Sequence, residues 1–268
     1  MRTLALLLGL LLTQSPALAE GLCPQPLRVG ISQIGYSYYL REDGTPAGSS
    51  FDFYDELARR SGCVFELVAQ PRIRAWHETE QRHLDIVSPT FRTPERDRHG
   101  QFVEYFRNRN DLILLRGPGK KIATFEQLLA DPAISIGLVR GHSNGAYFDE
   151  RLQPLMETPR IQLSPTAHNV FLKLRAGRIQ ATLMTAGLYQ KELDDLALSD
   201  EVRVIQVPQA DALSIGLYLS RLSLTPATID WLSQHVRAMV DDGTLRRLLS
   251  RQHGKRLTER FYAPTKSP

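Results

Sequence analysis

Short apolar runs alternate with amphipathic stretches over the first third of the chain. The runs at residues 27–31, 64–68 and 84–87 have the length and composition of buried strands. Apolar side chains recur at helical spacing over residues 51–58, and a shorter helix is predicted at 73–79. This β-α-β-α-β order predicts a parallel sheet that is covered by helices.

A second alternation begins at the apolar strand predicted at residues 111–115 and has the same α/β character. A last strand is predicted at residues 213–219, and two helices follow it. We therefore expect two small α/β lobes that are joined by strands, with a cleft between them. The second alternation comprises strands at 134–139, 161–163, 181–184 and 202–207 and helices at 124–130, 144–155 and 167–176, and the last helices are expected at 226–242 and 245–251.

Composition and charge are those of an ordinary globular protein. The chain has 268 residues, of which 42% are hydrophobic, and 33 Lys+Arg stand against 29 Asp+Glu for a net charge of +4. This balance excludes a disordered chain, and no stretch interleaves basic and aromatic residues as nucleic-acid binders do. The seven histidines and two cysteines show no metal-ligand spacing, and there is no nucleophile elbow or phosphate loop. We therefore expect no nucleic-acid partner, no metal and no cofactor.

The first 19 residues have the pattern of a secretory signal peptide. Arg2 gives a positive start, residues 4–12 are apolar, and Ala17-Leu18-Ala19 places small residues two apart at the expected cleavage site. The alternative is an uncleaved membrane anchor, but an anchor needs about 20 apolar residues and this run is much shorter. Cys23 is preceded by Glu20-Gly21-Leu22, which is unlike a lipid-attachment site. We expect residues 1–19 to be removed and the exported protein to have no stable membrane insertion.

The two cysteines lie at equivalent places in the predicted sheet. Cys23 precedes the strand at residues 27–31, and Cys63 directly precedes the strand at 64–68. Two neighbouring parallel strands would bring both cysteines to the same sheet edge, and an exported protein enters an oxidising compartment. We hypothesise a disulfide between Cys23 and Cys63, and the alternative is two unrelated buried thiols.

Several short motifs resemble the extracytoplasmic solute-binding proteins of the polar amino-acid ABC-transporter type, known as solute-binding family 3. The resemblance extends from Leu27 to Gly254. Each motif is short, and it is their order and spacing that carry the assignment. The motifs are LRVGIS at 27–32, G-x-x-F-D-x-x-x-E-L-A at 48–58, LDIVS at 84–88, TPER at 93–96, IGLVRGHS at 136–143, LRAGRI at 174–179 and DGTL at 242–245.

The resemblance implies a two-lobed periplasmic-binding-protein fold of type II, with the ligand cleft between the lobes, and a periplasmic location. It also implies discontinuous lobes: residues 20–112 plus 214–268 form the first lobe and residues 113–213 the second. The hinge strands are expected near residues 111–115 and 213–219.

Arg96 is the first candidate for contact with the ligand. In the family, the arginine that closes the T-x-x-R segment holds the ligand's carboxylate, and a planar guanidinium matches a carboxylate with paired donors. The stretch from Asp85 to Arg96 is one residue shorter than in the family, so Arg92 competes for this role. Ser88 and Thr90 follow the third predicted strand, at the carboxyl end where open α/β sheets bind ligands.

The second lobe contributes the strand-to-helix junction at residues 141–144. Its backbone N–H groups and helix dipole suit an anion, Ser143 adds a hydroxyl, and His142 adds an acid–base group. Alternatively, Ser143 or Asn144 only caps its helix. The resemblance implies an aromatic cover in the loop after the first strand, where Tyr36 is the candidate. Trp76 is a second aromatic candidate, with packing inside the lobe as its alternative.

One stretch departs from the family. Amino-acid binders of this type place an aspartate shortly after A-G-R-I-D-A, where it pairs with the ligand's ammonium. In this chain Gln180 and Thr185 stand where carboxylates are expected. A buried ammonium without a charged partner costs several kcal/mol, so the sequence favours a small anionic or polar solute, such as an organic acid, over an ordinary amino acid.

The resemblance therefore implies a monomeric, non-enzymatic protein that captures a small amino acid or organic acid by lobe closure and delivers it to an ABC-transporter permease. Two alternatives stay open. Relatives of the same fold include periplasmic cyclohexadienyl dehydratases, for which His142 is the one acid–base candidate in the cleft. An accessory or sensory protein would use the same closure to dock on another partner.

Overall fold

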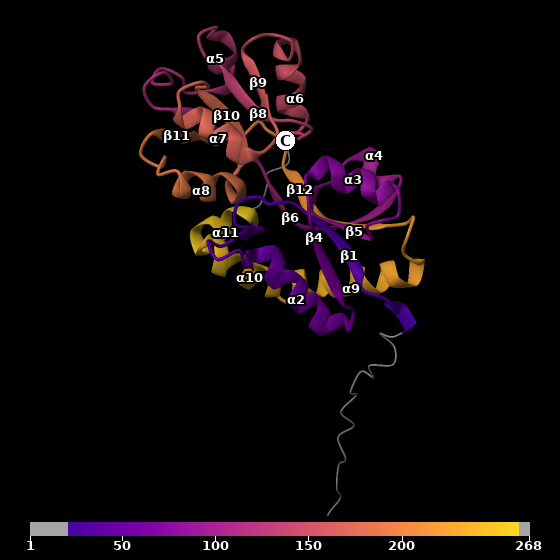
Figure 1. Ribbon diagram of the computed structural model, residues 1–268. Coiled ribbons are helices and arrows are strands. Elements are labelled where there is room, and N and C mark those ends of the chain that lie inside the picture. Colours follow the sequence, from indigo (N-terminus) through magenta and orange to yellow (C-terminus); the bar gives the residue numbers. More distant parts are fainter. Residues whose placement is uncertain (1–20, 263–268) are drawn as a thin grey trace, which may run out of the picture.

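Two five-stranded sheets form the centres of two α/β lobes in the computed structural model of the chain, which describes residues 21–262 (Figure 1). The predicted signal peptide at residues 1–19 lies outside the described residues. Within the part that is described, no helix has the length and apolar character needed to cross a membrane. The α/β class and the two lobes expected from the sequence are confirmed.

The sheet of the first lobe is mixed. Its parallel part consists of β1 (Leu27–Ile31), β4 (Phe65–Ala69) and β5 (Ile86–Phe91), with β1 in the middle. β12 (Leu213–Ser220) runs antiparallel to β5, and β6 (Gly100–Asn108) runs antiparallel to β12. The order across the sheet is β4-β1-β5-β12-β6, so the strand from the C-terminal part of the chain lies between two N-terminal strands.

Helices pack on this sheet and on one another. Their bounds are α2 Ser49–Ser61, α3 Arg72–Glu80, α4 Pro94–Asp97, α9 Pro226–Asp241, α10 Thr244–His253 and α11 Lys255–Tyr262, and a short hairpin joins β2 (Tyr39–Leu40) to β3 (Pro46–Ala47). α2 contacts α9 and α10, α3 contacts β1 and β5, and both α9 and α11 contact β6. The C-terminal helices therefore complete the first lobe.

The second lobe has its own sheet, in the order β11-β7-β10-β8-β9. The strands are β7 Asn110–Leu115, β8 Ile136–Val139, β9 Ile161–Ser164, β10 Ala181–Thr185 and β11 Val202–Ile205. β8 is parallel to β9 and β10, whereas β7 is antiparallel to β10 and β11. The helices are α5 Phe125–Ala130, α6 Ala146–Leu152, α7 Ala167–Arg175 and α8 Ala186–Asp195, and a 3-10 turn, η1 Gln153–Leu155, follows α6.

Threonine side chains begin several of these helices. Thr124, Thr166 and Thr225 each accept a hydrogen bond from the backbone N–H three residues further on, at the starts of α5, α7 and α9. Thr93 does the same at the start of α4 by accepting from Arg96 N. Each cap satisfies an otherwise unpaired amide and is worth about 1 kcal/mol.

The chain passes between the two sheets at two adjacent places. β6 ends at Asn108 and β7 begins at Asn110, so Arg109 alone separates strands of different sheets. The return path leads from β11 to β12, whose first residue, Leu213, pairs with Asn108. The crossings at Arg109 and before Leu213 lie close to the lobe boundaries expected from the sequence, which were residues 20–112 plus 214–268 for the first lobe and 113–213 for the second. We propose that the lobes divide at these crossings and that the hinge lies there.

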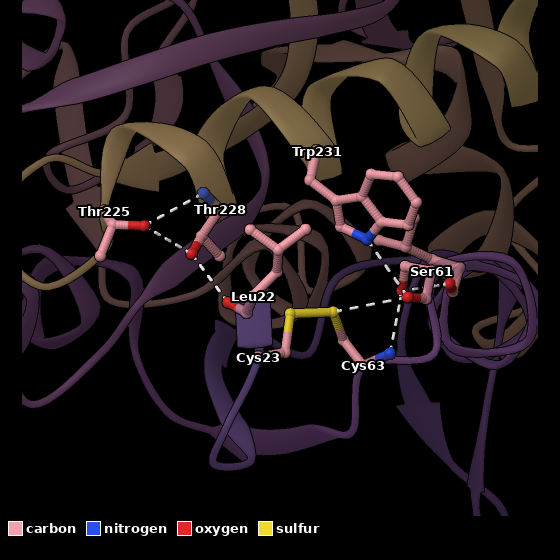
Figure 2. Close-up of a disulfide and its surroundings, with 8 residues drawn as sticks. Leu22, Cys23, Ser61, Cys63, Thr225, Thr228 and Trp231 are labelled. Atoms are coloured by element: carbon pink, nitrogen blue, oxygen red, sulfur yellow. Dashed lines mark hydrogen bonds between the residues drawn. A yellow bond between two sulfur atoms is a disulfide. The ribbon is translucent and has the colours of Figure 1, made fainter. Parts of the chain in front are cut away.

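A disulfide joins Cys23 to Cys63, with an S–S distance of 2.03 Å (Figure 2). The hypothesis from the sequence is confirmed, because β1 and β4 are parallel neighbours and both cysteines precede them at one end of the sheet. Leu22 O next to Cys23 accepts a hydrogen bond from Thr228 Oγ1, and Trp231 Nε1 donates to Ser61 O near Cys63. A bridge across 40 residues stabilises the fold by about 4 kcal/mol in the chain-entropy account.

Candidate functional site

A cavity lies between the two lobes, at the carboxyl ends of their parallel strands. The first lobe contributes the end of β5, the start of α3 and the short helix α4, and the second lobe contributes the turn after β8 and the end of β10. A second hollow shares part of this wall, including Arg72 and His142, and extends toward the turn after β9. Of the predicted site residues, those that line the first cavity are Ser88, Thr90, Arg96, His142, Ser143 and Thr185.

Arg96 lies at the wall of the cavity and is held there from several sides. Its Nη1 donates to Thr90 Oγ1 at 3.2 Å and to the Phe91 carbonyl at 2.9 Å. The guanidinium carbon lies 4.4 Å from the centre of the Trp76 ring, a cation–π contact. Burial lowers the pKa of Arg96 from its usual value. The guanidinium is thus positioned by neutral groups.

Arg72 lies at the same strand end, and sequence reasoning missed it as a candidate. It is the first residue of α3, its side chain is partly buried, and its Nη1 donates to the Pro89 carbonyl. Burial, followed by the charge of Arg96, lowers the pKa of Arg72 to about 10. Its position directly after β4, at the carboxyl end of a parallel strand, is the signal that could have identified it.

Arg92 has a different environment. Its side chain is 60% exposed and its Nε donates to Asp97 Oδ2 at 3.0 Å. Arg92 is not among the residues that line the cavity, whereas Arg96 is. The two arginines that competed in the sequence are therefore placed apart, one at the cavity and one at the surface with a carboxylate partner.

His142 faces the first lobe from the turn after β8. Its ring lies edge-on to Phe91, with 5.1 Å between the ring centres, and its Nε2 is buried without a hydrogen-bond partner in the described part of the chain. Burial, with Arg72 and Arg96 as further contributors, lowers the pKa of His142 to about 4. At neutral pH the imidazole is therefore uncharged and has a ring nitrogen available to a ligand.

The donors of the turn that follows His142 are already engaged. Ser143 Oγ donates to Asp149 Oδ2 at 2.8 Å, and the Asn144 backbone N–H donates to Asp149 Oδ1 at 3.1 Å. α6 begins two residues later than the sequence predicts, and its N-cap is Gly145 rather than Ser143 or Asn144. The carboxylate of Asp149 thus occupies the place where the sequence analysis expected an anion to bind.

Gln180 and Thr185, which stand where the family has carboxylates, lie in different surroundings. Thr185 ends β10, is 3% exposed and lines the cavity. Gln180 instead joins neighbouring segments, since its Oε1 accepts from Ser135 N and its Nε2 donates to Gly177 O. Across residues 21–262, no aspartate or glutamate lines the cavity, and neither Arg72 nor Arg96 forms a salt bridge.

The two aromatic candidates stand behind the cavity or at its rim. Trp76 packs between Arg96 and the Tyr218 ring, whose centre is 5.4 Å away. The Tyr36 hydroxyl crosses to the second lobe and donates to Asp194 Oδ2 of α8 at 2.8 Å. Burial and Asp194 raise the pKa of Tyr36 to about 12. Neither residue is among those that line the cavity.

Within residues 21–262, no group of three or more His, Cys, Asp and Glu side chains is placed to hold a metal ion. The polar groups of the cavity wall are instead two guanidiniums, several hydroxyls, the Asn108 amide and the imidazoles of His142 and His253. Guanidiniums and hydroxyls of this kind can bind an anion by charge-assisted hydrogen bonds.

The model for bacterial extracellular solute-binding proteins, family 3, matches residues 27–255. The fold is similar to that of the arginine-, lysine-, histidine-binding protein ArtJ from Geobacillus stearothermophilus, with a TM-score of 0.73 and 16% identity over 87% of this chain and 99% of that chain. It is also similar to an ancestral arginine-binding protein bound to arginine, with a TM-score of 0.74 and 16% identity over 85% of this chain and 98% of that chain. A substrate-binding protein of an ABC uptake transporter from Streptococcus pneumoniae, with bound histidine, gives a TM-score of 0.71 and 14% identity over 85% and 92%. No curated protein matches the sequence significantly.

Proposed function

The chain belongs to the bacterial extracellular solute-binding proteins of family 3, and on this premise we propose that it captures a small anionic solute, an organic acid, between its lobes. In this proposal the protein is a periplasmic monomer that hands the solute to the permease of an ABC transporter. The observation that carries the proposal is the pair Arg72 and Arg96, both partly buried in the cavity wall and without a carboxylate partner among residues 21–262.

Two neighbouring cations favour an anion physically. Water screens a partly buried guanidinium only weakly, so its interactions with other charges are strong. The two like charges at this strand end therefore repel each other. A carboxylate in the cavity offsets part of this repulsion and pairs with the planar donors of Arg96. Thr90 supports this contact because its hydroxyl orients the Arg96 guanidinium.

An ordinary amino acid fits this cavity less well than an organic acid. Its ammonium requires an acceptor of negative charge, and Thr185 supplies only a hydroxyl where the family supplies a carboxylate. The three similar structures are of proteins that bind arginine, lysine or histidine, whose side chains can carry positive charge. A positively charged side chain would meet Arg72 here, so we infer that this chain binds a ligand of the opposite charge.

Capture follows from the placement of the polar groups. The ligand anion first meets Arg96 and Thr90 on the first lobe, and hinge motion at the two strand crossings then brings His142 and Thr185 of the second lobe onto it. Ser88 lines the same wall, and its hydroxyl is linked to Tyr105 Oη at 3.1 Å. The closed form presents one surface made of both lobes, which a permease can distinguish from the open form.

A thermal-shift screen tests this proposal. The panel contains the twenty amino acids and a set of mono- and dicarboxylic acids at equal concentration. A ligand at about 100 times its dissociation constant adds roughly 2.7 kcal/mol to the free energy of unfolding, which raises the melting temperature measurably. We expect the shift from organic acids. Tight binding of a standard amino acid, with no shift from any organic acid, would contradict the proposal.

A further inference from the structure

We propose that the ligand carries two separate anionic groups, one bound by Arg96 and the other by Arg72 together with His142. This inference rests on the proposed function and narrows its substrate class to small dicarboxylates. The evidence begins with Arg72, which belongs to none of the sequence motifs. If Arg96 bound a single carboxylate, the position of Arg72 in the cavity wall would have no explanation.

Arg72 of α3 and Arg96 of α4 both reach the end of β5. Each forms a hydrogen bond with a backbone carbonyl there, and the two carbonyls belong to residues two apart in the strand. Arg72 donates to the Pro89 carbonyl, and Arg96 donates to the carbonyl of Phe91. Residues two apart on an extended strand are about 6–7 Å apart. One carboxylate cannot pair its two oxygens with both guanidiniums in the planar two-bond geometry, whereas the two ends of a short dicarboxylate can each meet one.

Both guanidiniums retain donors after these anchoring bonds. In each case the backbone contact uses Nη1, and a guanidinium offers five N–H groups in total. Arg72 makes no salt bridge within residues 21–262, and its side chain lines both hollows of the cleft. The unused donors of Arg72 therefore border space that a ligand can fill.

His142 completes the second anion position from the other lobe. Its Nε2 is buried without a partner in the described chain, and the residue lines the same two hollows as Arg72. Asp149, whose carboxylate lies beside this turn, already accepts from Ser143 and Asn144. His142 can thus donate a hydrogen bond to the second carboxylate, so that this end of the ligand contacts both lobes.

The charges of the cavity wall favour a dicarboxylate, as the spacing of the two arginines does. A monocarboxylate leaves one of the two guanidiniums without a counter-charge in a partly buried wall, and an amino acid adds a third positive group. A dicarboxylate compensates both. A compact dianion such as phosphate has a similar charge, but the charge is concentrated on one group. Comparison of its affinity with that of a dicarboxylate therefore shows whether binding depends on total charge or on the distance between two charged groups.

Calorimetric titration of the full-length exported protein provides the test. The probes are malonate, succinate, glutarate and adipate, the monocarboxylates propionate, butyrate and valerate, and inorganic phosphate. We expect one dicarboxylate length to bind at least about tenfold more tightly than monocarboxylates and phosphate. Arg72→Gln is expected to lower the dicarboxylate affinity by at least about tenfold and to lower the affinity for the matched monocarboxylate by a clearly smaller factor, so that the preference for the dicarboxylate is lost.

Arg74→Gln is the matched control, because Arg74 lies on the same helix, is 68% exposed and pairs with Glu78. It should leave every affinity unchanged. Arg72→Lys guards against misfolding of the first variant: it keeps the charge but loses the planar fork, and we expect intermediate dicarboxylate affinity. Circular dichroism checks the fold of each variant.

The outcomes distinguish this inference from the proposed function. Monocarboxylate binding as tight as dicarboxylate binding, or dicarboxylate selectivity that survives Arg72→Gln, overturns the second anion position and leaves anion capture standing. Preference for phosphate over every dicarboxylate also overturns it. Failure of the wild-type protein to bind any anion, together with tight binding of an amino acid, overturns both.

Discussion

In the proposed function, Thr185 is the single residue that matters most for the class of ligand. It ends β10, lines the cavity and is the N-cap residue of α8, where its side chain forms no capping hydrogen bond. Aspartate is among the best N-cap residues, so Thr185→Asp is compatible with the local backbone. We expect this variant to gain binding of neutral α-amino acids by about tenfold or more, because it supplies a partner for the ammonium. Calorimetry with alanine, serine and glutamine measures the change.

Thr185→Asn is the control for this substitution, because it has nearly the same shape and capping ability but no charge. It should not gain amino-acid affinity. The account of ligand charge would be wrong if Thr185→Asn and Thr185→Asp acted alike, or if the wild-type protein already bound these amino acids tightly.

Two histidines in the wall of the cavity make stability depend on pH. Burial lowers the pKa of both His142 and His253 to about 4, and for His142 the charges of Arg72 and Arg96 add to this while Asp149 opposes it. In the unfolded chain a histidine titrates near 6.5. Between these values the unfolded state binds more protons than the folded state, so the free energy of unfolding falls as the pH drops from about 6.5 to 4.

We expect this loss to be on the order of 1–3 kcal/mol for each histidine. Urea unfolding at pH 7 and pH 4.5 measures it, and the double variant His142→Gln/His253→Gln should lose clearly less than the wild type over this interval. An equal loss in both proteins would show that other groups cause the pH dependence.

The site shows which residues a sequence can and cannot reveal. Arg96 could be predicted as a ligand-binding residue because it is the last residue of the TPER motif. Thr185 could be predicted because it stands where the family has an aspartate. Arg72 belongs to no motif, and its importance depends on a contact with Pro89, 17 residues away. Tyr36 could be placed in the correct loop, but its bond to Asp194, 158 residues further on, depends on how the lobes are arranged.

At the scale of elements, α11 connects the two lobes beside the strand crossings. Arg260 of α11 donates to Asp111 Oδ2 of β7 at 2.6 Å, and Tyr189 of α8 donates to the same oxygen at 2.9 Å. On the first lobe, Phe261 stacks on Phe106 of β6 with 4.8 Å between ring centres. Figure 1 shows α11 next to α8, at the junction of the lobes. α11 is therefore placed to limit the relative motion of the lobes.

Substitution of Arg260 by a neutral residue should destabilise the protein more than neutralisation of its partner, Asp111. The Asp111 side chain is only 3% exposed, and burial raises its pKa despite the nearby Arg260. Arg260→Met leaves that carboxylate buried without a counter-charge, which costs about 3 kcal/mol, whereas the neutral Asp111→Asn costs less. Urea unfolding measures both changes.

The double variant Asp111→Asn/Arg260→Met supplies the internal check. It removes both charges and should recover part of the stability that Arg260→Met loses. Wild-type stability of Arg260→Met would contradict a role for this ion pair in holding α11.

Elements with a clear apolar period were predicted, and those stabilised by distant contacts were missed. The strands at 27–31 and 181–184 and the long helix at 226–242 were found within one residue of their observed bounds. β6 was missed because charged residues interrupt its sequence, GQFVEYFRN, and β12 stabilises it through pairing. α11 was missed because half of its residues, KRLTERFY, are charged and its buried Phe261 packs on another element.

β5 extends to Phe91, four residues beyond the predicted end at 87. Ser88-Pro89-Thr90 has the composition of a loop, and proline is unusual inside a strand. Pairing of Thr90 with Gly216 and of Phe91 with Ile215 continues the strand. This extension carries the carbonyls that anchor Arg72 and Arg96, so the sequence could not have shown how the two guanidiniums are spaced.

For the whole molecule, alternation of apolar runs was sufficient to predict two α/β lobes, and the order of short motifs was sufficient to predict the family. The interleaving of β12 between β5 and β6 could not be derived from alternation, because it depends on pairing over more than 100 residues. The same interleaving places the two strand crossings side by side, which makes hinge motion about them possible. This arrangement of the strands is consistent with the proposed capture of a ligand between the lobes.

The most direct test of this proposed capture is calorimetric titration of Arg96→Ala and Arg92→Ala with the organic acid that gives the wild-type protein its largest thermal shift. Arg96 lines the cavity and Arg92 forms an exposed pair with Asp97. Loss of a partly buried charge partner costs 2–5 kcal/mol or about 30-fold to several thousand-fold in affinity, whereas an exposed pair contributes about 0–1 kcal/mol. The account predicts that Arg96→Ala abolishes measurable binding and that Arg92→Ala binds nearly as the wild type does. Retained binding by Arg96→Ala, with loss of binding by Arg92→Ala, would contradict it.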